Sequence, residues 1–186
     1  MVYCIMLSEF RKFVGFKILE YFLTHPREEA YLKEIAKKLQ VNPASVKNYC
    51  DIFEKEGLIK KKIKGNLHLF STNNENFCIR EMKKAYISSL LNELKIEKIS
   101  ESAISIAIYG SYASGDYDEK SDLDILIIGE EKDVKKEYLL KIMKKIGKEI
   151  QLTIIRPVKW EEMKRKNDPF VKSVLRNHIL IKGVEL

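Results

Sequence analysis

Proline, glycine and tryptophan are scarce in this chain of 186 residues, with four, eight and one of each. So little Pro and Gly excludes a collagen-like or low-complexity architecture. No apolar run approaches the roughly 18 residues that a membrane-spanning helix needs, so we expect no membrane partner. The opening stretch, MVYCIMLSEFRK, has neither a basic region nor a small-residue cleavage site. We therefore expect no signal peptide and a cytoplasmic protein.

Cysteine and histidine are also few, with three of each scattered along the chain. Cys4, Cys50 and Cys78 form no Cys-x-x-Cys pair, and we expect buried free thiols in a reducing compartment. Zinc sites need such residues at close spacing. We therefore expect no metal site built from His and Cys.

Apolar residues make up 45% of the chain, enough to bury a core, which excludes disorder as its overall state. Charged residues make up 33%, mostly Lys and Glu, as is common in proteins of hyperthermophiles. The net charge of +7 is distributed unevenly. Residues 1–99 carry 18 Lys+Arg against 12 Asp+Glu, whereas residues 100–186 carry 16 against 15. This asymmetry predicts two parts with different partners.

The spacing of apolar residues predicts the elements of the basic first part. It indicates a helix over 10–24, which Pro26 terminates. A second helix has an apolar face made of Leu32, Ile35, Ala36 and Leu39. Asn42 suits the N-cap, and Pro43 the first position, of a third helix over about 43–56.

Residues 58–71 predict two short strands around Lys64-Gly65-Asn66, which suit a hairpin turn. Helix, helix, short turn, helix and hairpin is the order of a winged helix-turn-helix domain. The stretch AYLKEIAKKLQVNPASVKNYCDIFEKEGLIKKKIKGNLHLFSTN resembles that family along its whole length. The order of elements carries this resemblance, and no single residue is diagnostic.

The winged-helix resemblance implies DNA binding, with the third helix in the major groove and the hairpin on phosphates. The residues in these positions are Ser45, Lys47 and Asn48, with Tyr49 beside them, and Lys60, Lys61, Lys62 and Lys64. The alternative is a protein-docking module whose lysines form a solvated surface. Because one small domain binds DNA weakly, we expect a homodimer for specific binding.

The second part contains a motif with recognisable spacing. A buried strand predicted at 103–109 leads directly into Gly110-Ser111. Ten residues later, Asp122-Leu123-Asp124 leads into an apolar run at 125–128. The stretch IAIYGSYASGDYDEKSDLDILII resembles the minimal nucleotidyltransferases of the DNA polymerase beta superfamily, without insertion or gap.

Each part of this motif has a chemical reason. Asp122 and Asp124 are two residues apart on a strand, so both side chains leave the same face. Two such carboxylates can hold Mg²⁺, the usual partner of nucleotide phosphates, and we expect ATP or another nucleoside triphosphate as substrate. Gly110 lets the backbone approach the phosphates, and Ser111 offers an N–H and a hydroxyl. Solvated residues at a strand end are the alternative for the Asp pair.

One position departs from the family pattern. The family places a third carboxylate in the next strand, predicted here at 149–155, where this sequence has Gln151. Three interpretations stay open. The site works with two carboxylates and reduced activity, Glu149 substitutes for the acid, or the domain binds nucleotide without turnover.

Two functions follow from these resemblances. The first is transfer of AMP from ATP to a hydroxyl of a protein partner, often a tyrosine of a HEPN toxin in this branch. The second is a DNA-binding regulator whose transferase-like domain binds nucleotide or a partner without efficient catalysis. The expected fold is α/β with two domains. It has a winged helix at 1–74, a connecting helix at 75–99, and an α+β nucleotidyltransferase domain with a mixed sheet at 100–186.

Overall fold

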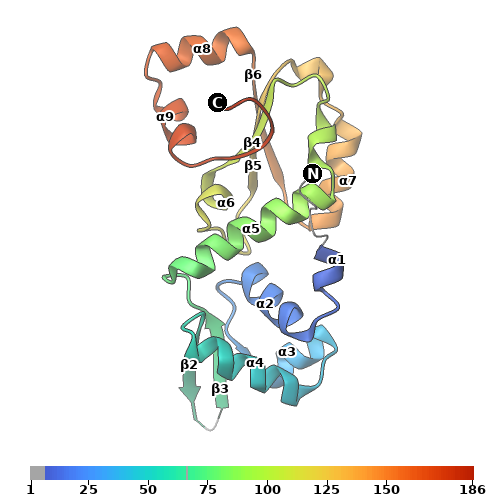
Figure 1. Cartoon of the computed structure of the whole chain (residues 1–186), viewed down its shortest axis with the longest axis vertical. Helices are drawn as coiled ribbons and strands as arrows, with labels where there is room; N and C mark the ends of the chain where they lie inside the picture. Colours follow the sequence, from blue (N-terminus) through green and yellow to red (C-terminus); the bar gives the residue numbers. More distant parts are fainter. Residues whose placement is uncertain (1–6, 66) are drawn as a thin grey trace. The chain divides into compact units, whose positions relative to one another are not determined.

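The computed structural model describes residues 7–65 and 67–186, and the chain forms two compact units (Figure 1). The first unit runs to Ser89 and also contains Tyr117–Glu119. The second comprises Leu90–Asp116 and Lys120–Leu186. The units are therefore not consecutive stretches of sequence. Among the described residues, no helix combines the length and apolar character needed to cross a membrane.

Short helices and a small antiparallel sheet, in the order β1-β3-β2, make up the first unit. The elements are α1 (Leu7–Phe10), α2 (Val14–Thr24), β1 (Ala30–Tyr31), α3 (Leu32–Leu39), α4 (Pro43–Lys55), β2 (Ile59–Lys64), β3 (Leu67–Thr72) and the first part of α5 (Phe77–Glu93). Buried side chains from α2, α3, α4 and the sheet form one apolar core. Its members include Ile18, Phe22, Ile35, Val46, Cys50 and Phe70.

The predicted third helix is confirmed, together with the signals at its start. Asn42 is the N-cap of α4, and its side-chain oxygen accepts a hydrogen bond from the Ala44 N–H at 2.8 Å. Pro43 occupies the first helical position. Gly57 follows the end of α4 with a φ of +70°, a conformation that glycine adopts without strain. Local signals in the sequence therefore mark where α4 begins and ends.

Two expectations for the first unit need correction, and one strand was not predicted. The helix predicted over 10–24 is interrupted, because Phe13 is extended (φ −89°, ψ 123°) and 66% exposed, and α2 begins after it. The two-residue strand β1, which pairs with β3, had no signal in the sequence. Cys78 is exposed, whereas Cys50 is buried as expected. Cys4 and the turn residue Asn66 lie outside the described residues.

The second unit is a mixed sheet flanked by helices, as predicted, with the strand order β6-β5-β4-β7. β5 and β6 are parallel and joined through a helix, whereas β4 is antiparallel to both β5 and β7. The elements are η1 (Ile96–Ile99), β4 (Ser105–Tyr109), α6 (Gly110–Ser114), β5 (Leu123–Ile128), η2 (Glu131–Asp133), α7 (Lys136–Ile146), β6 (Ile150–Ile155), α8 (Pro157–Arg165), α9 (Pro169–Arg176) and β7 (Ile179–Gly183).

The two faces of this sheet differ in what covers them. Side chains alternate along β5, so Asp124, Leu126 and Ile128 share one face. Leu126 and Ile128 belong to an apolar cluster with side chains of α8 and α9, namely Trp160, Val171 and Val174. In Figure 1, α8 and α9 lie on one side of the strands and α7 on the other. Helices α8 and α9 therefore cover the sheet face that carries Asp124, over the part of β5 that follows Asp124.

Candidate active site

Three polar side chains form a row across the sheet of the second unit. Tyr109 of β4 pairs with Asp124 of β5, and Asp124 pairs with Gln151 of β6. Directly paired residues on neighbouring strands project from the same face. Asp122 lies one residue before β5 and two before Asp124. The sheet therefore brings both carboxylates of the motif next to position 151.

Gly110 lies directly against one of these carboxylates. It begins α6 immediately after β4, with a φ of +69°. A Cβ at this position would lie 2.3 Å from Oδ2 of Asp124 and 3.3 Å from its Cγ. The two halves of the motif, ten residues apart in the sequence, thus meet at this contact. Both the left-handed backbone and the lack of space require glycine here.

The short helix α6 turns the chain back after Ser111. Gly115 ends α6 in the left-handed region, with a φ of +78°. The Asp116 N–H donates to the Ser111 carbonyl at 2.9 Å, and the Ser114 hydroxyl donates to the same oxygen at 3.2 Å. Gly115 therefore shapes this turn.

The electrostatics of the aspartate pair fit a cation. Burial, followed by the charge of Asp122, raises the pKa of the Asp124 carboxyl above its usual value. Gln151 donates from Nε2 to Oδ2 of Asp122 at 2.8 Å, which holds that carboxylate in place. Two carboxylates that repel each other in this way form a hard oxygen donor set suited to Mg²⁺.

The described part of the chain places no third acidic side chain in this set. Within residues 7–65 and 67–186, no group of three or more His, Cys, Asp or Glu side chains is placed to hold a metal ion. Glu149, the predicted substitute, precedes β6, and its carbonyl accepts a hydrogen bond from the Leu123 N–H at 3.0 Å. The amide of Gln151 therefore occupies the place where the family has an acid.

Tyr109, which pairs with Asp124, was not singled out from the sequence as a neighbour of the aspartate pair. The hydroxyls of Tyr109 and Thr153 lie 2.8 Å apart, within hydrogen-bonding distance, and link β4 to β6. The ring of Phe170 contacts Tyr109 edge-on, with centroids 5.5 Å apart. The position of Tyr109 directly before Gly110 was the available signal, because it makes Tyr109 the last residue of the strand.

In the first unit, the predicted base-contacting residues lie on α4. Lys47 and Asn48 are exposed and Ser45 is partly buried, and Lys47 pairs with Asp51 at 2.9 Å. Tyr49 packs against Gly15, where an added Cβ would lie 2.5 Å from the tyrosine ring. Tyr49 therefore contributes to the packing of the unit, and contact of this side chain with bases stays untested.

The lysines of β2 separate into two sets. Alternation along the strand puts three exposed side chains on one face: Lys60, Lys62 and Lys64. Two of them reach acidic partners, with Lys60 at 2.9 Å from Glu75 and Lys62 at 3.3 Å from Glu29. Lys61 projects from the other face and pairs with Glu54 of α4 at 3.6 Å. Lys61 thus lies apart from the three exposed lysines, and its contact with phosphates stays a prediction.

Comparison with known families identifies the second part of the chain. The family described as "Nucleotidyltransferase domain" matches residues 87–181, just over half of the chain. The chain belongs to this nucleotidyltransferase family. The nucleotidyltransferase is 35% identical, over 104 residues, to a protein of Methanocaldococcus jannaschii named provisionally as a protein adenylyltransferase. The match covers 55% of this chain and 92% of that relative.

A second Methanocaldococcus jannaschii protein with the same provisional name is 42% identical to the nucleotidyltransferase over 59 residues. This match covers 32% of the chain and 50% of the relative. Two solved structures are more distant, each at 17% identity. The match to a crystal structure of a toxin-antitoxin with AMP-PNP covers 53% of this chain and 74% of the matched chain, with a TM-score of 0.37. The MntA–HpeT toxin-antitoxin covers 55% and 74%, with a TM-score of 0.33.

Proposed function

We propose that this nucleotidyltransferase transfers AMP from ATP to a hydroxyl group of a protein partner. The observation that carries the proposal is the contact of Gly110 with Asp124, beside an Asp122 held by Gln151. This contact unites the Gly-Ser and Asp-x-Asp halves of the motif in one site. The provisional names of the two relatives support a protein as the acceptor.

The residues present fit the expected metal. Asp122 and Asp124 would hold Mg²⁺, because they are adjacent carboxylates and burial and mutual repulsion raise the pKa of one of them. Mg²⁺ bound there supplies charge neutralisation at the triphosphate and favours ionisation of the acceptor hydroxyl. Gly110 leaves room for phosphate oxygens close to the backbone, and Ser111 offers its N–H and hydroxyl to them.

The bonds exchanged in this reaction are those of a phosphoryl-type displacement. The acceptor oxygen forms a bond to the α-phosphorus of ATP, and the bond from that phosphorus to the bridging oxygen breaks, which releases pyrophosphate. The hydroxyl proton leaves the acceptor. Gln151, a neutral amide, cannot accept that proton, so the proton passes to an aspartate of the pair or to water. Positioning and charge stabilisation carry most of the catalysis in such reactions.

The decisive experiment is transfer of label from α-labelled ATP, in the presence of Mg²⁺, to a candidate protein acceptor. Asp124→Asn should abolish transfer, because it removes one of two carboxylates without changing the shape of the side chain. Asp116→Asn is the matched control, since Asp116 is an exposed acid in the segment between α6 and β5. Equal labelling by the wild type and by Asp124→Asn would contradict the proposal.

We further propose that the first unit contains a winged helix within residues 1–74 that binds DNA. The order α2, β1, α3, α4, β2, β3 supports this, as do exposed side chains of α4 and the face of β2 with Lys60, Lys62 and Lys64. Ser45, Lys47 and Asn48 would face bases, and the lysines would face phosphates. Specific binding would use a homodimer. The protein acceptor proposed above would then be a HEPN-type partner encoded together with this chain.

A second candidate function has its own observation. Gln151 leaves the site with two acids, which also suits a regulator that binds nucleotide and turns it over inefficiently. Such a regulator would bind DNA in a nucleotide-dependent way and release little or no pyrophosphate. Measuring pyrophosphate release together with DNA binding therefore separates the two functions.

A further inference from the structure

The loop between the two halves of the nucleotidyltransferase motif belongs to the first unit. Tyr117–Glu119 lies between Gly110-Ser111 and Asp122 in the sequence, yet it clusters with residues up to Ser89. The contacts inside the first unit explain this assignment, because each of the three loop residues is bound there.

Lys83 of α5 holds the first of these residues. Its side chain is 1% exposed, and its Nζ donates to the Tyr117 carbonyl at 2.6 Å and to Oδ1 of Asn74 at 3.4 Å. The same Nζ lies 4.4 Å from the centre of the Tyr117 ring. A buried ammonium is costly unless it is hydrogen-bonded, and hydrogen bonds to charged groups are strong ones. The Tyr117 carbonyl is therefore held firmly.

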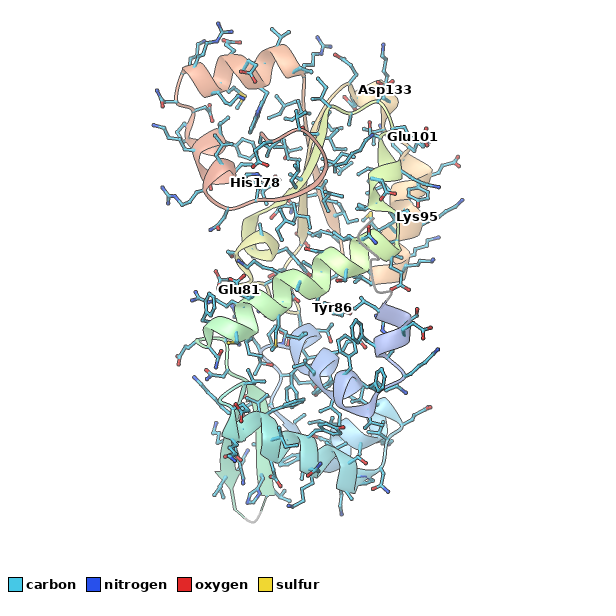
Figure 2. All side chains as sticks on the ribbon, viewed as in Figure 1. Glu81, Tyr86, Lys95, Glu101, Asp133 and His178 are labelled. Carbon is cyan, nitrogen blue, oxygen red and sulfur yellow. The ribbon has the colours of Figure 1, made fainter. Side chains whose placement is uncertain are left out.

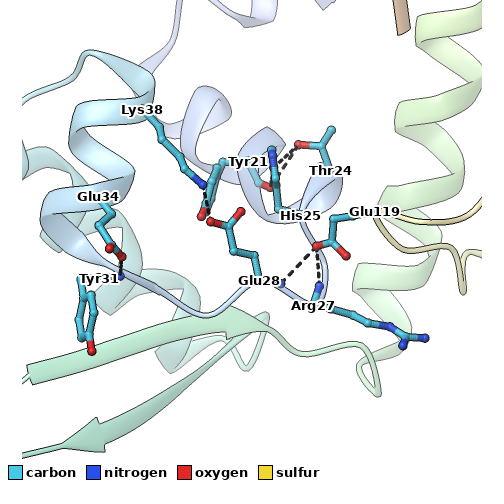
Figure 3. A network of polar contacts seen from close by, with 9 residues as sticks. All are labelled: Tyr21, Thr24, His25, Arg27, Glu28, Tyr31, Glu34, Lys38 and Glu119. Atoms are coloured by element: carbon cyan, nitrogen blue, oxygen red, sulfur yellow. Dashed lines mark hydrogen bonds and ion pairs between the residues drawn. The ribbon is translucent and has the colours of Figure 1, made fainter. Parts of the chain in front are cut away.

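Asp118 and Glu119 are bound by the segment that follows α2. Figure 3 shows Oε1 of Glu119 accepting from the N–H groups of Arg27 and Glu28, at 2.9 and 3.2 Å. Nε of Arg27 lies 2.8 Å from Oδ2 of Asp118. The loop thus has three anchors, a backbone carbonyl and two carboxylates, on two separate segments of the first unit.

Little chain separates these anchors from the motif. Asp116, directly before Tyr117, is hydrogen-bonded to the Ser111 carbonyl. Asp122 follows Glu119 by three positions, which span at most about 10 Å. A shift of the anchored residues therefore has to be taken up at Ser111 on one side or within three residues of Asp122 on the other.

We propose that Lys83 is a positioning residue for nucleotide binding, and that through Tyr117–Glu119 the first unit sets the affinity of the nucleotide site. The proposal rests on the function proposed above, because it needs Ser111 and Asp122 to contact the nucleotide. Coupling of this kind is reciprocal. A change in the first unit that loosens the loop lowers nucleotide affinity, and bound nucleotide stabilises the contacts of the loop in the first unit.

The test compares Lys83→Met with Lys84→Met in the full chain. Methionine keeps much of the length of lysine and removes the charge. Lys84, the neighbouring residue, pairs at 2.8 Å with Glu81, which is labelled in Figure 2. The readouts are the affinity for a fluorescent ATP analogue with Mg²⁺ and hydrogen exchange of peptides covering residues 111–121. We expect Lys83→Met to weaken binding by about fivefold or more and to speed exchange of the loop. Lys84→Met should change neither readout.

The other outcomes decide the proposal as well. A purely structural role for Lys83 would lower the melting temperature and leave analogue affinity unchanged below it, and that result overturns the proposal. If Lys83→Met does not fold, Glu119→Gln, which weakens the contacts with Arg27 and Glu28, decides it by the same two measurements. If the wild type binds no analogue, the proposed function fails. Hydrogen exchange of residues 111–121 in the variants then tests only whether Lys83 anchors the loop. An unchanged exchange rate would show that it does not.

Discussion

Gly110 combines a left-handed backbone with a carboxylate directly beside its α-carbon. Gly147 has only the first property. Gly147, which ends α7, has a φ of +64° and no atom within 4 Å of an added Cβ. An alanine at position 110 combines a strained left-handed backbone with overlap of its Cβ and Asp124, whereas an alanine at position 147 has the backbone strain alone. Comparing the two substitutions therefore separates the two costs.

Gly110→Ala should therefore abolish AMP transfer, whereas Gly147→Ala should retain it. Each substitution should lower the free energy of unfolding by about 1 kcal/mol for the backbone, and Gly110→Ala by more, because its Cβ overlaps Oδ2 of Asp124. Denaturant unfolding and the labelled-ATP assay measure the two effects. Full transfer activity in Gly110→Ala would show that the close approach of Gly110 to Asp124 is not needed for the reaction.

Position 151 allows a second test at the scale of one residue. Gln151→Asp introduces a third acid but removes the amide that binds Asp122. We expect transfer to rise if the wild-type site is a weakened version of the family site. Gln151→Ala, which removes the amide without adding an acid, is the control and should reduce transfer. If neither substitution changes the rate, the amide and an acid at this position are both irrelevant to the reaction.

Among the elements, α4 and β2 carry the proposed DNA surface, but their lysines are not free of acidic partners. Lys47, Lys60 and Lys62 each pair with an exposed Asp or Glu. Exposed pairs of this kind contribute little stability, so phosphates could replace the acids at small cost. Three lysines of the proposed surface are thus already partly neutralised by neighbouring acids.

The double variant Lys60→Gln/Lys62→Gln should weaken DNA binding by the full chain. If both lysines contact phosphates, the slope of log K against log salt should fall by about 2, close to one unit per contact. Lys159→Gln is the control, because Lys159 is an exposed lysine paired with Glu162 in α8. Fluorescence anisotropy with a DNA duplex at several salt concentrations measures the slope. An unchanged slope would exclude β2 from the interface.

Elements with local signals could be predicted from the sequence, and those fixed by distant contacts could not. Asn42 and Pro43 marked the start of α4. The motif spacing likewise placed Gly110 beside the Asp pair. By contrast, β1 is two residues long and exists only through its pairing with β3. The hydrogen bond from Gln151 to Asp122 depends on the parallel register of β5 and β6, which no local pattern sets.

At the scale of the whole molecule, the loop Tyr117–Glu119 makes the first unit sensitive to what the nucleotide site binds. The N–H groups of Arg27 and Glu28 both donate to Glu119. If nucleotide orders the loop, these amides should exchange more slowly in its presence, by the reciprocity of coupled sites. Their distance in sequence from the Gly-Ser motif makes them an independent reporter.

We therefore expect a non-hydrolysable ATP analogue with Mg²⁺ to slow hydrogen exchange in a peptide covering residues 25–31. The Ala44 N–H, which donates to Asn42, is the control within the same unit and should exchange at an unchanged rate. Mass spectrometry of the full chain measures both. Equal effects on both peptides would indicate general stabilisation, and no effect on residues 25–31 would contradict the coupling.

The discontinuous first unit also has a consequence for biosynthesis and for domain grafting. Tyr117 follows Ser89 by 28 positions, so the ribosome makes Leu90–Asp116 before the last piece of the first unit exists. Domains usually fold in the order of their synthesis. Here the earlier unit cannot complete its contacts until the start of the later one has emerged. A chimera that transplants residues 1–89 alone would leave behind the carbonyl that Lys83 binds.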